Sequence, residues 1–116
     1  MMSDGLVAVL GVSGMLGHTV FRVLDSAMAT VGIMRGALDD PALVSLKLRR
    51  VIDGFDVTDS ARLGRCLERL GVRAVVNCIG VTPQRAGEDP TDSIRVNALF
   101  PRLLGKICAQ LGARLI

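Results

Sequence analysis

Three glycines near the N-terminus, Gly11, Gly14 and Gly17, follow an apolar run that is long enough for a β-strand. The residues after them have the pattern of an amphipathic helix. A strand that passes through glycines into a helix brings backbone N–H groups and the positive end of the helix dipole to one point, where a phosphate can bind. In such a loop Gly11 permits the tight turn, Gly14 lets the backbone approach a pyrophosphate, and Gly17 lets the helix pack closely. The residues that we expect to bind a dinucleotide here are Gly11, Ser13, Gly14, Met15, Leu16 and Gly17.

The spacing of these glycines is Gly-x-x-Gly-x-x-Gly rather than the usual dinucleotide pattern Gly-x-Gly-x-x-Gly, so the first turn is wider and Ser13 partly closes it. This variant resembles the extended branch of the short-chain dehydrogenase/reductase superfamily. The alternative interpretation is a loop that simply needs flexible residues.

Apolar patterns typical of strands and of helices alternate along the rest of the chain. The sequence predicts strands at Ala29–Met34, Arg50–Asp56 and Val72–Gly80, and a fifth strand that opens at Arg114–Ile116. It predicts one helix from Met15 to about Ala27, a second that Thr58 or Asp59 caps and that Gly71 stops in a left-handed conformation, and a third from Thr91 or Asp92 to Leu111. Pro101 lies inside the last helix and should kink it or mark an irregular turn, because proline removes one donor from the helix. Residues 37–50 and 81–90 are predicted to be connections.

This alternation implies right-handed β-α-β crossovers and a parallel sheet. We expect one α/β domain over residues 1–116, a doubly wound Rossmann-type sheet with strand order 3-2-1-4-5 that is truncated in the fifth strand. The glycine loop and the segment from Asn77 to Gly80 would face each other where the strand order reverses, so a bound cofactor would contact both.

Arg35 follows the second strand, where Rossmann domains discriminate between cofactors. A carboxylate at this place suits the ribose of NAD, whereas an arginine suits the 2′-phosphate of NADP. Arg35 therefore favours NADP, while Asp39 and Asp40 keep NAD as the alternative. Arg35 as a solvent-exposed strand end is the other interpretation.

Composition excludes several classes of protein. The net charge of +3 comes from scattered arginines, so a nucleic-acid partner is not indicated. The first residues lack the basic start of a signal peptide and the glycines interrupt the apolar run, so we expect a cytoplasmic protein with no membrane partner. Cys66, Cys78 and Cys108 are odd in number and widely spaced within apolar patterns, which favours buried free thiols over disulfides or a metal site.

Four segments together resemble one subgroup, the dTDP-4-dehydrorhamnose reductase-like sugar-nucleotide reductases: the glycine loop, Asp56-Val57, Val75–Gly80 and Ile94–Asn97. The resemblance implies that Asp56 and Val57 contact the adenine ring and that Asn97 supports the active site. It also implies that the end of the fourth strand lies beside the cofactor, at Asn77, Cys78, Ile79 and Gly80. Alternatively, Asn77 satisfies a turn and Asn97 is a surface or structural amide.

The same family carries its chemistry on a Ser or Thr after the fifth strand and on a Tyr-x-x-x-Lys helix. This chain contains no tyrosine. We therefore expect the NAD(P)-binding half of a nucleotide-sugar reductase or epimerase, with no catalytic residue of its own and a nucleotide-sugar substrate only when the missing half is present. The alternative is a non-catalytic dinucleotide-binding regulatory or interaction module. An exposed edge at the fifth strand would favour self-association.

Overall fold

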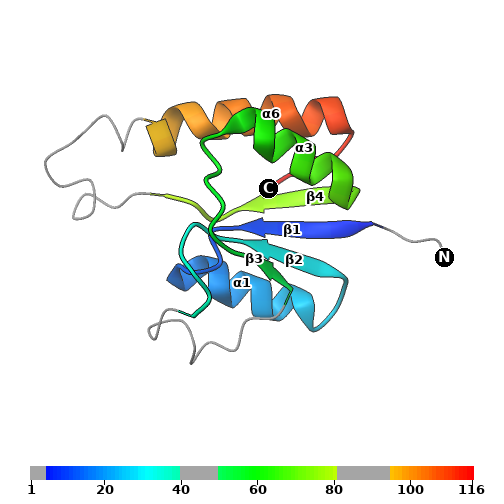
Figure 1. The fold of residues 1–116 in the computed structure, drawn as a ribbon. Coiled ribbons are helices and arrows are strands. Elements are labelled where there is room, and N and C mark those ends of the chain that lie inside the picture. The colour runs from blue at the N-terminus through cyan, green and yellow to red at the C-terminus, as the bar shows by residue number, and fades with distance from the viewer. Residues whose placement is uncertain (1–4, 40–49, 81–94) are drawn as a thin grey trace, which may run out of the picture.

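The computed structural model describes residues 5–39, 50–80 and 95–116, which form a five-stranded parallel sheet with helices on both faces (Figure 1). The strand order is β3-β2-β1-β4-β5, which confirms the predicted Rossmann-type order. The elements in chain order are β1 (Leu6–Leu10), α1 (Met15–Asp25), β2 (Thr30–Ile33), β3 (Val51–Ile52), α3 (Ser60–Leu70), β4 (Val72–Asn77), the π-helical segment η1 (Arg95–Leu99), α6 (Phe100–Leu111) and β5 (Arg114–Leu115).

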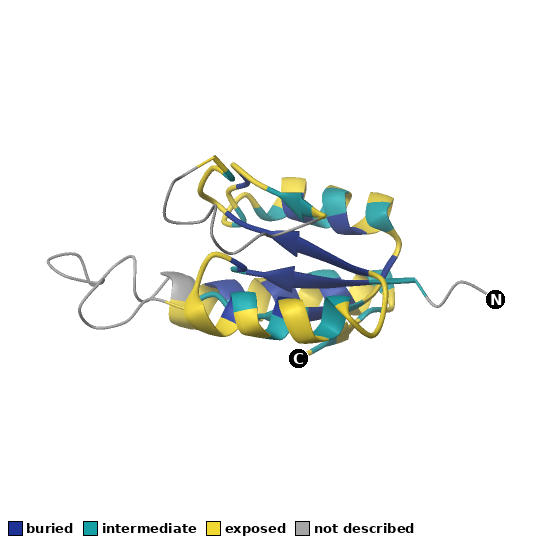
Figure 2. Cartoon of the chain, turned by 90° about the horizontal axis from the view of Figure 1, so that it is seen from below, coloured by how far each residue is buried: buried dark blue, intermediate teal, exposed yellow. Residues whose placement is uncertain are grey.

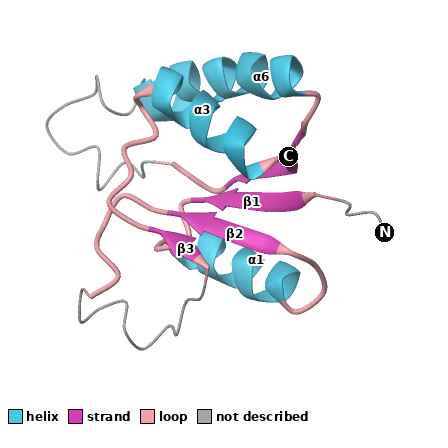
Figure 3. Ribbon diagram, turned by 45° about the vertical axis from the view of Figure 1, so that its right-hand side comes forward, coloured by secondary structure: helices cyan, strands magenta, loops and turns pink. Residues whose placement is uncertain are grey.

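The sheet separates two apolar cores, because α1 covers one face and α3 with α6 covers the other (Figure 3). On the α1 face, Val9 and Val12 pack with Phe21 and Met34. The larger core lies under α3 and α6, and its buried members include Leu10, Leu63, Leu67, Leu104 and Cys108. The central strands are therefore buried between the two helical layers, as Figure 2 shows. This explains why they read as continuous apolar runs rather than alternating ones.

Helix α3 has clear signals at both of its ends. The side chain of Asp59 accepts a hydrogen bond from the backbone N–H of Arg62 at 3.2 Å, so Asp59 rather than Thr58 is the N-cap. Gly71 ends the helix with φ +66° in the left-handed region, as predicted. Gly112 ends α6 in the same way, with φ +69°.

The third strand is shorter than predicted. We expected Arg50–Asp56, but β3 covers only Val51–Ile52. Gly54 takes φ +60°, a conformation that leaves the strand, although the N–H of Phe55 still donates to the carbonyl oxygen of Met34 at 3.0 Å. The pair Asp56-Val57 therefore lies in the connection to α3 and not at a strand end.

The sequence predicts a kink or an irregular turn at Pro101. The structure has this irregularity about one turn before the proline. The π-helical segment η1 runs directly into α6, with Leu99 in a helical conformation, and Pro101 is the second residue of α6. A proline has no N–H to donate to the preceding turn, and π-helical segments are a common form of such local irregularity. The predicted start of this helix at Thr91 or Asp92 lies outside the described residues. The remaining boundaries differ from the prediction by a few residues: α1 ends at Asp25, and β4 ends at Asn77.

The cysteines are free thiols, but the prediction that all of them are buried is wrong for two. Cys108 is buried in the larger core, whereas Cys66 and Cys78 are half-buried. Cys66 lies at the edge of the α3 packing surface and Cys78 lies just beyond β4, where the sheet ends. Within the described ranges, none of the helices is both long and apolar enough to cross a membrane.

Gly17 is the position where a side chain should damage the fold most directly. A Cβ atom at Gly17 would collide with the backbone carbonyl of Gly11, which has no freedom to move away. We expect Gly17→Ala to lower the free energy of unfolding by about 2 kcal/mol or more, measured by urea denaturation.

The matched control is Gly64→Ala in the interior of α3. A Cβ there would meet only the Cγ2 atom of Ile107, at an ordinary distance of 3.8 Å. This change should raise the free energy of unfolding by about 0.5–1 kcal/mol, because alanine favours a helix. Equal stability of the two variants would contradict the close contact between α1 and the glycine loop.

Candidate functional site

The carboxyl ends of β1, β2 and β4 meet at one edge of the sheet, where a cavity of about 230 Å³ opens. Four segments line it: the glycine loop, the end of β2, the connection from β3 to α3, and the segment after β4. The lining residues are Gly11, Ser13, Gly14, Ile33, Met34, Arg35, Phe55, Asp56, Val57, Thr58, Cys78, Ile79 and Gly80.

Gly11 brings the glycine loop against the end of β4. It has φ +85°, and a Cβ atom there would lie 2.9 Å from Cγ1 of Ile79 and 3.1 Å from the carbonyl oxygen of Cys78. The backbone N–H of Gly14 closes the turn by donating to the carbonyl oxygen of Gly11 at 3.2 Å. Only glycine satisfies both the positive φ and the close approach at position 11.

Gly14 is the N-cap of α1, with φ −81° and ψ 165°, and no side chain caps the helix. The first turn carries no acidic residue that would compete with a bound anion. The first N–H groups of a helix have no acceptor within it, so those of Met15 and Leu16 are suited to an anion. The side chains of Met15 and Leu16 are 87% and 63% exposed and do not line the cavity, so any contribution from these residues is made by their backbone.

The surroundings of Gly14 pass a simple test of whether a phosphate group fits here. A Cβ atom at Gly14 would meet only the carbonyl oxygen of Gly11, at an ordinary 3.6 Å, and its φ is one that any residue adopts. The fold therefore does not itself require glycine at position 14. A glycine beside uncapped helix N–H groups leaves room for a ligand to approach the backbone.

Another residue of the cavity lining, Asp56, is held by its neighbour Thr58. Its Oδ1 atom accepts hydrogen bonds from the Thr58 hydroxyl at 2.6 Å and from the Thr58 backbone N–H at 3.0 Å. These bonds lower the pKa of the Asp56 carboxyl, and the positive charges of Arg35 and Arg62 lower it further. The cavity therefore presents a carboxylate together with an arginine.

Asn77 acts on the site through a turn. Its Oδ1 atom accepts a hydrogen bond from the backbone N–H of Ile79 at 3.1 Å, which bends the chain out of β4. Asn77 does not line the cavity, so the alternative interpretation of a strand-end turn describes it. Asn97 is an exposed residue of η1 that approaches the same turn, since a Cβ atom at Gly80 would lie 3.6 Å from the Oδ1 atom of Asn97.

The structure brings most of the predicted site residues into one cavity. Five of the candidates are not in its lining: Met15, Leu16, Gly17, Asn77 and Asn97. Asp39, the carboxylate that kept NAD as an alternative, is exposed and also outside the lining, while Asp40 lies outside the described residues. For these five candidates and for the two aspartates, contact with a ligand stays a prediction.

Four lining residues were missed: Ile33, Met34, Phe55 and Thr58. Ile33 and Met34 were recognised as a strand, and the rule that ligands bind at the carboxyl ends of strands would have added them. Thr58 was considered only as a helix cap, although its place two residues after Asp56 is the spacing of a side-chain turn. No group of three or more acidic, histidine or cysteine residues able to hold a metal occurs in the described part of the chain.

A model of the NAD dependent epimerase/dehydratase family matches residues 7–116. The chain belongs to this family. No curated protein sequence matches it.

Several solved enzyme structures share the fold of this chain. L-threonine 3-dehydrogenase from Trypanosoma brucei superimposes with a TM-score of 0.82 at 14% identity, over 94% of this chain and 34% of that one. A hypothetical dTDP-4-dehydrorhamnose reductase from Sulfolobus tokodaii has a TM-score of 0.76 at 15% identity, over 94% of this chain and 37% of that one. Thermus thermophilus UDP-glucose 4-epimerase in complex with NAD has a TM-score of 0.74 at 22% identity, over 95% of this chain and 36% of that one. The chain thus spans about a third of the length of these proteins, and the likeness shows the fold.

The hydrogen bond from Thr58 makes a testable prediction about acid–base behaviour. We expect the pKa of Asp56 to lie below its ordinary value of 3.8, and Thr58→Val to raise it, because the hydroxyl bond to the carboxylate is lost. Carbon-detected NMR titration of the carboxyl group measures both values. The charged carboxylate stabilises the folded chain above pH 3.8, and this contribution disappears as the pH falls through the lower folded-state pKa.

Thr19→Val is the matched control. The Thr19 hydroxyl donates to the carbonyl oxygen of Met15 and touches no carboxylate, so this variant should leave the pKa of Asp56 unchanged. An Asp56 pKa at or above 3.8 in the wild-type chain would contradict the described turn.

Proposed function

We propose that the chain is the NAD(P)-binding half of a nucleotide-sugar reductase or epimerase of the dTDP-4-dehydrorhamnose reductase type. The observation that carries the proposal is the single cavity that joins the uncapped N-terminus of α1 with Arg35, Asp56 and the turn after β4. The family match and the NAD complex of a structural neighbour support a dinucleotide as the ligand.

Each side of the cavity has a separate task in this proposal. The N–H groups at the start of α1 bind the pyrophosphate, which approaches the backbone at Gly14. Asp56 and Val57 lie against the adenine end, and the turn from Cys78 to Gly80 borders the ligand where it crosses the sheet edge. When bound, NAD(P) supplies the hydride acceptor or donor.

We further propose that NADP is preferred over NAD. Arg35 lines the cavity and is near enough to Asp56 for its charge to lower the pKa of that carboxyl. A guanidinium on the ribose side suits a 2′-phosphate, because it can donate two parallel hydrogen bonds. In the described part of the chain, no carboxylate other than Asp56 lines this cavity.

Gly14→Val tests the glycine loop. The added side chain would occupy the space that the pyrophosphate needs, so we expect binding of NAD and NADP to be abolished in calorimetric titrations. The fold should survive, because the backbone at Gly14 accepts any residue; urea denaturation checks this. Unchanged affinity in a folded variant would overturn the assignment of this loop.

Arg35→Asp tests the choice of cofactor. We expect NADP binding to weaken by about 1–3 kcal/mol more than NAD binding, the scale of a hydrogen bond between charged groups. Arg22→Asp, which changes the same charge on the exposed side of α1, should leave the ratio of the two affinities unchanged. If both variants leave the ratio unchanged, Arg35 has no part in recognising the 2′-phosphate.

The chain alone should not turn over a nucleotide sugar. It contains no tyrosine that could act as the proton donor, and a positioned acid or base contributes about 10²–10⁴-fold in rate. We expect no NADPH oxidation by the purified 116-residue chain with a dTDP-4-keto sugar. Turnover by contaminant-free chain would show that the chemistry does not depend on residues outside it. If the natural full-length protein binds a dinucleotide but does not turn over a nucleotide sugar, the result favours the regulatory module instead.

A further inference from the structure

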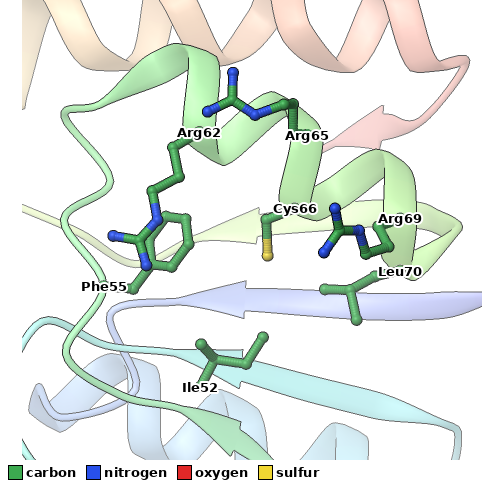
Figure 4. Close-up of a pocket in the computed structure, with 7 residues that line it drawn as sticks. All are labelled: Ile52, Phe55, Arg62, Arg65, Cys66, Arg69 and Leu70. Atoms are coloured by element: carbon green, nitrogen blue, oxygen red, sulfur yellow. The ribbon is translucent and has the colours of Figure 1, made fainter.

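A second cavity, of about 480 Å³, lies beside α3 near the β3 edge of the sheet. Figure 4 shows the side chains that line it, which come from β3, from the connection after it and from one side of α3. They are Ile52, Phe55, Arg62, Arg65, Cys66, Arg69 and Leu70. Phe55 is the one lining residue that this cavity shares with the dinucleotide cavity.

The cavity combines an apolar floor with concentrated positive charge. In Figure 4, Arg62 and Arg69 extend on either side of Cys66, and Arg65 extends from the upper side of the helix. The guanidinium carbon of Arg62 lies 4.5 Å from the centre of the Phe55 ring. Burial raises the pKa of the Cys66 thiol, while the charges of Arg62 and Arg69 oppose that rise.

The cavity lining contains no carboxylate to offset these charges. Asp56, next to Phe55, lies outside the lining and is near enough to Arg62 for that charge to lower its pKa. Arg62, Arg65 and Arg69 recur at intervals of three and four residues, so they share one side of α3, and like charges at such intervals destabilise a helix by a few tenths of a kcal/mol per pair. An anion bound beside these guanidinium groups would weaken this repulsion.

We propose that this cavity binds an anionic small molecule with a flat apolar body, such as an aromatic phosphate monoester. The phosphate would contact Arg62 and Arg69, and the apolar body would pack on the half-buried side chains of Ile52 and Leu70. The volume is typical of small-molecule sites, and the lining combines arginine side chains with apolar residues, as a ligand with an anionic group and an apolar body requires. The proposal does not depend on dinucleotide binding at the other cavity.

Calorimetric titration with 1-naphthyl phosphate tests the proposal. We expect binding, with about tenfold loss of affinity in Arg69→Gln, because one charged hydrogen bond is lost. Arg22→Gln is the matched control: it removes the same charge from α1, on the opposite face of the sheet, and should leave the affinity unchanged (Figure 1). Neutral 1-naphthol and inorganic phosphate should each bind more weakly than the combined molecule.

Alkylation of the cysteines locates the bound probe. We expect 1-naphthyl phosphate to slow the reaction of Cys66 with iodoacetamide and to leave that of Cys78, which lines the dinucleotide cavity, unchanged. Mass spectrometry of the separate peptides measures both rates. Protection of Cys78 alone, equal affinity of the two arginine variants, or no binding would overturn the proposal. Arg69-dependent binding of a poly-glutamate peptide without binding of the phosphate ester would also overturn it, in favour of an acidic protein partner.

Discussion

The close contact between Gly11 and Gly17 is the constraint on which the rest of the structure depends. Gly11 leaves β1 with a positive φ, and α1 begins so near to it that Gly17 has no room for a Cβ atom. This contact fixes the first turn of α1 at the carboxyl end of the central strand. The uncapped N–H groups of that turn therefore point at the sheet edge where neighbouring strands also end.

The strand order then brings distant segments of the chain to the same place. Because β2 and β4 pair with β1 on its two sides, Arg35 after β2 and Cys78 after β4 both border the glycine loop. The connection after β3 adds Asp56, which the bonds from Thr58 hold as a carboxylate. Gly11 makes the approach of β4 especially close, since a side chain there would meet Ile79. The site thus results from the parallel strand order together with the three glycines of the loop, Gly11, Gly14 and Gly17.

The parts of the fold that follow from local pattern could be predicted from the sequence. The central strands are buried on both faces and read as apolar runs, and Gly71 and Gly112 mark helix ends through their left-handed conformation. The length of β3 was overestimated although the sequence carries a signal for its end. Asp53-Gly54 is a dipeptide typical of turns, and Gly54 takes φ +60° directly after the strand.

The candidate site was predicted less evenly than the fold. Glycine spacing identified the loop, but it could not show that Gly14 has free space whereas Gly17 has none, since that difference depends on where α1 packs. Asn77 is another such case, because its amide is used in a turn that only the path of the chain after β4 reveals. The arginines of α3 appeared in the sequence as scattered surface charge, and only the fold places them around a cavity with Phe55.

The most direct test of the central claim is to map where a dinucleotide contacts the chain. Amide resonances of the nitrogen-labelled protein, followed during titration with NADP, report this residue by residue. The largest shifts should occur at Ser13–Gly17, with further shifts at Arg35, at Asp56–Thr58 and at Cys78–Gly80, while the exposed side of α1 stays unchanged. Saturable shifts confined to other parts of the chain, or no saturable shifts in the folded protein, would contradict the account.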